Sequence, residues 1–168
     1  MKNLIYPLFF LILFSCKKNC TPDYEIISSK YSNPFISGQN EMIRKFDKID
    51  FDRYRLADIN ESEVPYIMKM IKSQIPLNKK ATERMKNNIC DYSVQIGGFY
   101  DVKDKTKKIY LNFLYGWNLK ETKDEILIGN NGEETKFEIV NDGGDYFFQA
   151  IIDTKKDTLH IIYINGEA

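Results

Sequence analysis

The sequence has few of the residues on which most catalytic and metal-binding motifs depend. Its 168 residues include one histidine and three cysteines, too few for a zinc site with the usual cysteine and histidine spacing. No Gly-x-Ser-x-Gly segment marks a serine nucleophile, and no glycine-rich loop precedes a helix that starts with Lys-Ser or Lys-Thr. We therefore expect no metal and no other cofactor.

An excess of charge of one sign is also missing. Lys and Arg together number 24, as do Asp and Glu, so nothing in the overall charge attracts a phosphate backbone. We expect no nucleic-acid partner. There is neither an internal repeat nor a low-complexity tract, and 43% hydrophobic with 29% charged residues is typical of one compact domain.

The one long apolar run, residues 4–14, is too short for a membrane span. As a helix it would cover roughly 16 Å, about half of a hydrocarbon core of about 30 Å. With a lysine before it, the run is typical of a signal peptide. We expect residues 1–15 to be this signal peptide, residues 16–23 to be a polar tether and residues 24–168 to form a single domain.

The end of this segment carries a motif of its own. Leu13-Phe14-Ser15-Cys16 resembles the lipobox of bacterial lipoproteins, in which the cysteine is lipidated and becomes the mature N-terminus. The resemblance implies that acyl chains such as palmitate on Cys16 anchor the protein to a membrane of the cell envelope. Lys17 stands where some lipoproteins carry an acidic inner-membrane retention signal, so we expect the outer membrane, facing the periplasm. The alternative is an ordinary secretory signal followed by a chance cysteine.

Two further cysteines, Cys20 and Cys90, would then lie in an oxidising compartment. They are candidates for a disulfide. The alternative is that Cys90 is a small buried hydrophobic residue between a helix and a strand.

The middle of the chain predicts one firm helix. Its apolar residues recur at helical spacing from Val64 to Ile75, Asn60 or Ser62 can cap it, Pro65 suits its first turn and Pro76 ends it. A second, mostly solvated helix is expected from about residue 78 to residue 88.

After residue 89 the period changes to that of β-strands. Residues 92–100 with 108–115, and 145–152 with 158–164, predict two hairpins, and residues 124–140 predict a peripheral third. Gly97-Gly98 indicates a bulge or the close approach of another backbone. Residues 24–27 are a candidate short strand.

Alternation along these strands predicts two faces. The face under the helix is nearly all apolar; it comprises Tyr92, Val94, Ile96, Ile109, Leu111, Phe113, Tyr146, Phe148, Ala150, Ile152, Leu159, Ile161 and Tyr163. The other mixes amides with aromatic residues and is the candidate binding face; its members are Gln95, Tyr110, Asn112, Phe147, Gln149 and His160. The alternatives for this second face are an ordinary solvated sheet face or one covered by residues 24–57.

The expected fold is therefore α+β, with an antiparallel sheet of four to six strands and one or two helices on one face. This two-layer arrangement is compatible with a cystatin-like or an NTF2-like topology.

Two sequence features offer chemistry. His160, the only imidazole, lies between Leu159 and Ile161 and is expected to be a structural or surface residue. Asp142 and Asp145 flank two glycines and could act as acids or hold a cation, but they lack the spacing of a calcium loop, so a glycine-enabled turn with solvated acids is favoured.

The strands and turns of the second half carry a family resemblance. Tyr92–Phe99, Ile109–Phe113, Asp142–Phe147 and Asn165–Ala168 together resemble a group of small bacterial lipoproteins or secreted proteins that end in an Asp-Gly-Gly, aromatic pair, Asn-Gly-x-Ala pattern. The resemblance covers residues 88–168 and departs from the group in a longer insertion at residues 117–136. It implies no activity and no catalytic residues.

The sequence thus assigns no reaction. The leading hypothesis is a lipid-anchored binding or interaction protein of the cell envelope, for example an immunity protein that neutralises a toxin in the periplasm. The alternative is an envelope hydrolase that uses acidic residues near Asp142 and Asp145.

Overall fold

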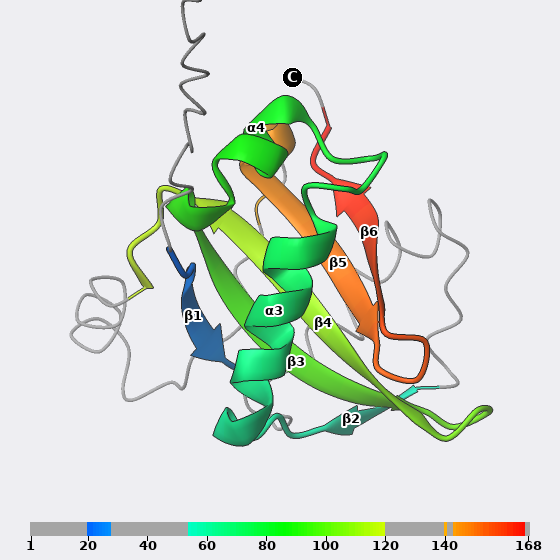
Figure 1. Cartoon of the computed structure of the whole chain (residues 1–168). Coiled ribbons are helices and arrows are strands. Elements are labelled where there is room, and N and C mark those ends of the chain that lie inside the picture. Colours follow the sequence, from blue (N-terminus) through cyan, green and yellow to red (C-terminus); the bar gives the residue numbers. More distant parts are fainter. Residues whose placement is uncertain (1–19, 28–53, 120–139, 141–142, 167–168) are drawn as a thin grey trace, which may run out of the picture.

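Six strands form one mixed sheet with a helix across one face (Figure 1). The computed structural model describes residues 20–27, 54–119, 140 and 143–166. The strands are β1 (Asp23–Ile26), β2 (Tyr54–Ala57), β3 (Tyr92–Asp101), β4 (Thr106–Tyr115), β5 (Phe147–Asp153) and β6 (Thr158–Ile164), and the helices are α3 (Val64–Gln74) and α4 (Glu83–Asn87). The sheet order is β1-β3-β4-β5-β6, and β2 also pairs with β3. The expected two-layer α+β fold is confirmed.

Both hairpins in the second half of the chain are confirmed. β3 and β4 pair over their full lengths, from Tyr92 opposite Tyr115 to Asp101 opposite Thr106. β5 and β6 pair antiparallel around the turn at residues 154–157. The predicted peripheral hairpin at residues 124–140 lies outside the described residues, apart from Val140.

The edge beyond β3 differs from the antiparallel sheet that the sequence predicts. β1 pairs with β3 in parallel, with Asp23 opposite Ser93 and Ile26 opposite Ile96. β2, which the sequence did not reveal, pairs antiparallel with the second half of β3. Parallel strands are joined by a long connection rather than a tight turn, so no turn motif in the sequence predicts this pairing.

Helix α3 starts and ends as its sequence predicts. The backbone N–H of Asn60 donates to Glu63 Oε2 at 2.9 Å in a capping box of the 3-10 helix Glu61–Glu63, which leads directly into α3. Pro65 lies in the first turn of α3 itself. The second helix is shorter than predicted, because Thr82 caps α4 and the preceding residues form turns.

The core lies between α3 and the apolar face of the sheet. The predicted residues of strands β3 to β6 are buried there, with Phe113 stacked on Phe148 at 4.1 Å between ring centroids. Two predicted members are elsewhere. Tyr146 is exposed in the 3-10 helix Gly144–Tyr146, and Tyr163 lies opposite Gln149. A β-bulge causes the second change, because Ile162 has no partner in the register and every later residue of β6 changes face.

A glycine allows β2 to approach β3. A Cβ atom on Gly98 would lie 2.5 Å from the backbone oxygen of Ala57 and 2.9 Å from Ile59 Cδ1. The close backbone approach predicted at Gly97-Gly98 therefore occurs at Gly98.

The outer edge of β6 is capped by side chains. Gln74 Nε2 donates to the Asp157 backbone oxygen at 2.8 Å, and the Leu159 backbone N–H donates to Gln74 Oε1 at 2.7 Å. Lys80 Nζ donates to the Ile161 backbone oxygen at 3.1 Å. These contacts block part of an edge that could otherwise pair with another chain.

Candidate functional site

The amides of the candidate binding face form a row across the sheet. The register places Glu25, Gln95, Asn112, Gln149 and Tyr163 side by side on five neighbouring strands. Gln95 Nε2 donates to Glu25 Oε2 at 3.3 Å, Asn112 Nδ2 donates to Gln95 Oε1 at 3.1 Å, and Gln149 Nε2 donates to Asn112 Oδ1 at 3.3 Å. We call Glu25, Gln95, Asn112 and Gln149 the amide ladder.

The side chains of the amide ladder are buried rather than exposed to solvent. Gln95 is 1% exposed, Asn112 2%, Gln149 4% and Glu25 6%. Buried amides are stabilised when they bond to one another, so this row fixes the strand register. The alternative of an ordinary solvated sheet face does not hold for these amides, because almost none of their surface is exposed. Recognition of a partner by them stays a prediction.

The other three members of the candidate face differ in exposure. Tyr110 is buried, which raises the pKa of its hydroxyl. Phe147 is half-buried, with its ring perpendicular to that of Trp117 at 6.4 Å. His160 is exposed on β6, where its Nε2 lies 3.1 Å from Thr158 Oγ1. His160 and Phe147 are therefore the members that reach the surface.

Asp145, one of the two acids proposed for chemistry, is held in an ion pair. Arg84 bonds to its Oδ1, and Thr82 Oγ1 donates to its Oδ2 at 2.5 Å. The guanidinium of Arg84 also stacks on Tyr146, 3.8 Å from the ring centroid. Both carboxylate oxygens thus have partners, and the contacts join α4 to the start of β5. Asp142 lies outside the described residues.

A tyrosine hydroxyl adds a further hydrogen bond at Asp145. Tyr92 Oη donates to the backbone oxygen of Asp145 at 2.6 Å. Burial of the Tyr92 ring, reinforced by the nearby Asp145 charge, raises the pKa of its hydroxyl. Tyr92 therefore stays protonated and works as a structural donor.

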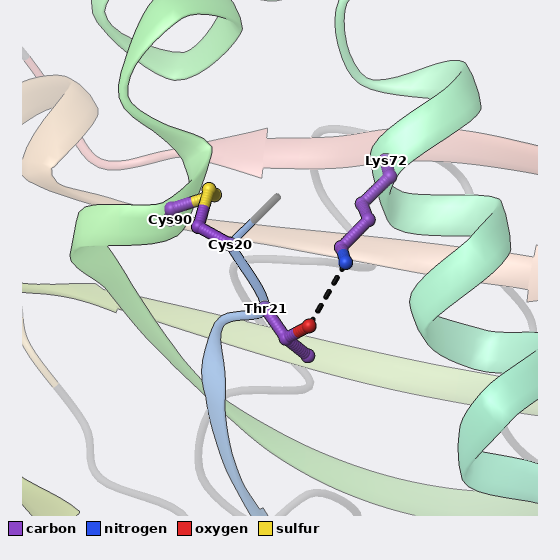
Figure 2. The surroundings of a disulfide bond; sticks show 4 residues. All are labelled: Cys20, Thr21, Lys72 and Cys90. Carbon is purple, nitrogen blue, oxygen red and sulfur yellow. Dashed lines mark hydrogen bonds between the residues drawn. A yellow bond between two sulfur atoms is a disulfide. The ribbon is translucent and has the colours of Figure 1, made fainter. Parts of the chain in front are cut away.

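Cys20 and Cys90 form a disulfide, with 5.8 Å between their Cα atoms. Figure 2 shows it joining the segment before β1 to the turn before β3, and beside it Lys72 Nζ donates to Thr21 Oγ1 at 2.9 Å. Residues 20–23, which the sequence assigns to the tether, therefore belong to the folded domain. Cys16 lies outside the described residues.

The opposite end of the sheet contains a buried ion pair. Lys108 Nζ lies 2.5 Å from Asp153 Oδ2, and both side chains are 9% exposed. Burial alone would raise the pKa of Asp153. The hydrogen bonds from Lys108 and from the backbone N–H of Lys156 outweigh burial and hold that pKa below its ordinary value.

The surface of α3 is hollowed only shallowly. An open groove of about 480 Å³ is lined by Pro65, Met68, Lys69, Lys72 and Ser73. Among the described residues, no three His, Cys, Asp or Glu side chains are placed to hold a metal ion. Neither α3 nor α4, the helices of the described part, is long and apolar enough to span a bilayer.

Comparison with known proteins adds no relative: no family model, no curated protein and no solved structure matches this chain.

Proposed function

We propose that this chain is a lipid-anchored interaction protein of the cell envelope, attached through Cys16. The observation that carries the proposal is the Cys20–Cys90 disulfide, four residues after the lipobox cysteine. Disulfides form and persist in oxidising compartments, which supports export. Lys17 in place of an acidic residue supports the outer membrane, with the domain facing the periplasm.

Interaction with a protein partner is favoured over hydrolysis by how the polar groups are engaged. The amide ladder is internally bonded, and Asp145 is paired with Arg84 and Thr82. These contacts suit a structural role better than acid–base work, which needs a carboxyl group open to substrate. A toxin neutralised in the periplasm is one partner of this kind.

The surface that we propose for the partner is the turn end of the β3–β4 hairpin. Tyr100 is 46% exposed and Val102 47% exposed there, and Lys103 and Lys105 follow them on the turn. Exposed apolar side chains beside flexible cations suit a protein surface with an apolar centre and an acidic rim.

The anchor is tested by membrane fractionation and by labelling cells with radioactive palmitate. The wild-type chain should sediment with membranes and carry the label, whereas Cys16→Ser should do neither. Cys90→Ser is the matched control, because it removes a cysteine but leaves the lipobox intact, and it should remain labelled. Label on Cys16→Ser would contradict the assignment.

The partner surface is tested by a photo-crosslinking residue at Val102 in living cells, with the same residue at Asn87 on α4 as the control. A discrete crosslinked protein band should appear only for position 102, and Tyr100→Ala should weaken it while the circular dichroism spectrum stays unchanged. Identical crosslinks from both positions would contradict a partner surface at this hairpin.

A further inference from the structure

We propose that the domain has a fixed orientation on the bilayer. The end that faces the lipid is formed by Cys90, the Tyr115–Trp117 segment and Tyr146. We call this the disulfide end. The inference rests on the proposed lipidation of Cys16. It adds the surface that faces the lipid and, by exclusion, the surface presented to the periplasm.

The chain between the lipid anchor and the folded domain is short. Cys16 and Cys20 are four residues apart, and an extended chain covers at most about 3.6 Å per residue, so Cys20 stays within roughly 14 Å of the lipidated residue. The disulfide then fixes Cys20 to Cys90, just before β3. Therefore the covalent path from lipid to sheet core enters at this end, whatever conformation residues 17–19 adopt.

The disulfide end is rich in tryptophan and tyrosine. The backbone N–H of Gly116 donates to the Asp91 backbone oxygen at 2.9 Å, which places the Trp117 segment beside the disulfide turn. Tyr146 is 42% exposed, and its ring lies perpendicular to that of Tyr115 at 5.2 Å. Tryptophan and tyrosine favour the interface between lipid and water, where their rings are buried and their polar atoms stay wet.

Two ion pairs at the disulfide end reduce the charge that opposes this contact, while Asp91 on the disulfide turn is exposed. Arg84 bonds to Asp145, and Lys86 Nζ lies 3.0 Å from Glu83 Oε1. Paired charges near a neutral lipid surface cost less to bring close than isolated ones.

The opposite end is formed by the turns at residues 102–105 and 154–157 (Figure 1). β3 has ten residues, which at about 3.3 Å each place these turns roughly 30 Å from the disulfide end. They carry four exposed lysines, Lys103, Lys105, Lys155 and Lys156, and include the hairpin end proposed for the partner. An upright domain would hold this surface well away from the membrane.

The single tryptophan makes the orientation measurable. The lipidated full chain is reconstituted into phosphatidylcholine vesicles with and without a lipid that bears a nitroxide at its headgroup, and the quenching of Trp117 fluorescence is recorded. Two comparison variants move the tryptophan to the opposite end: Trp117→Phe with Val102→Trp, and Trp117→Phe with Lys155→Trp. Both new positions are exposed turn residues, so at least one should fold with an unchanged circular dichroism spectrum.

Quenching of Trp117 should be several-fold stronger than quenching at position 102 or 155. Equal quenching at the two ends, or stronger quenching at the far end, would overturn the orientation while leaving the anchor intact. A chain that does not float with the vesicles would overturn the anchor and, with it, the orientation, so the two failures are distinguishable.

Discussion

Loss of the Cys20–Cys90 disulfide is expected to lower the free energy of unfolding by about 4 kcal/mol. The bridge joins residues 70 positions apart. In the loop-entropy model, a closed loop of that length removes about 15 cal/mol/K of entropy from the unfolded chain, or about 4 kcal/mol at 25 °C. Both cysteines are half-buried, so replacing sulfur by oxygen changes the native packing little.

Urea denaturation followed by circular dichroism measures this loss. With a denaturant slope of about 2 kcal/mol per molar, the midpoint should fall by about 2 M in Cys20→Ser, in Cys90→Ser and in the double variant alike, because each removes the same bridge. Lys72→Met is the matched control. It breaks the neighbouring hydrogen bond to Thr21 and should cost less than about 1 kcal/mol.

Two results would refute this reasoning. A loss below about 1 kcal/mol in all three cysteine variants would show that the unfolded chain is not restrained as the loop model requires. A double variant far less stable than either single variant would show that Cys20 and Cys90 stabilise the domain by separate packing contacts.

Two further predictions concern Gly98 on β3 and Lys108 on β4. Gly98→Ala should lower stability by about 1–3 kcal/mol, because its Cβ would meet the Ala57 backbone oxygen and force β2 away; thermal denaturation measures this, and an unchanged melting temperature would contradict it. Lys108→Met should cost about 3 kcal/mol at neutral pH, because Asp153 loses its close, buried ammonium partner and keeps only Lys156 Nζ at 3.8 Å. Because the folded-state pKa of Asp153 is lowered, its stabilisation is present above about pH 4 and is lost as the pH falls through the folded-state value, so the variant should lose less stability than wild type on acidification.

Much of the fold follows from local patterns in the sequence. Apolar residues recur at every second position in β3 to β6 and about every 3.6 positions in α3, so each element has one apolar side. Burial of these apolar sides is the main force that assembles the two layers. Pro65 suits the first turn of α3, and Asn60 caps the 3-10 helix that leads into it, for reasons that lie within one or two turns of helix. A reader of the sequence can therefore place these elements and most of the core.

Local sequence patterns predicted only part of the candidate site. Gln95, Asn112 and Gln149 were placed on one face by alternation, but the sequence alone gives an amide in a strand the same appearance whether it meets water or another amide. Glu25 was missed because it joins the amide ladder through the parallel pairing of β1 with β3, and no turn motif in the sequence predicts that pairing. The one feature of the sequence that could have identified Glu25 is its position as a charged residue inside the candidate strand at residues 24–27.

The sequence by itself determined helix α3 and strands β3 to β6, the apolar face of these elements at nearly every position, and which cysteines exist to be lipidated or bridged. Tertiary structure alone decided that β1 is parallel, that a bulge turns Tyr163 away from the core, that the amides bond to one another, and that Asp145 is paired with Arg84. The physical reason is that periodicity and capping act within a few residues of chain. Register, pairing and the partners of buried polar groups depend on contacts between segments tens of residues apart.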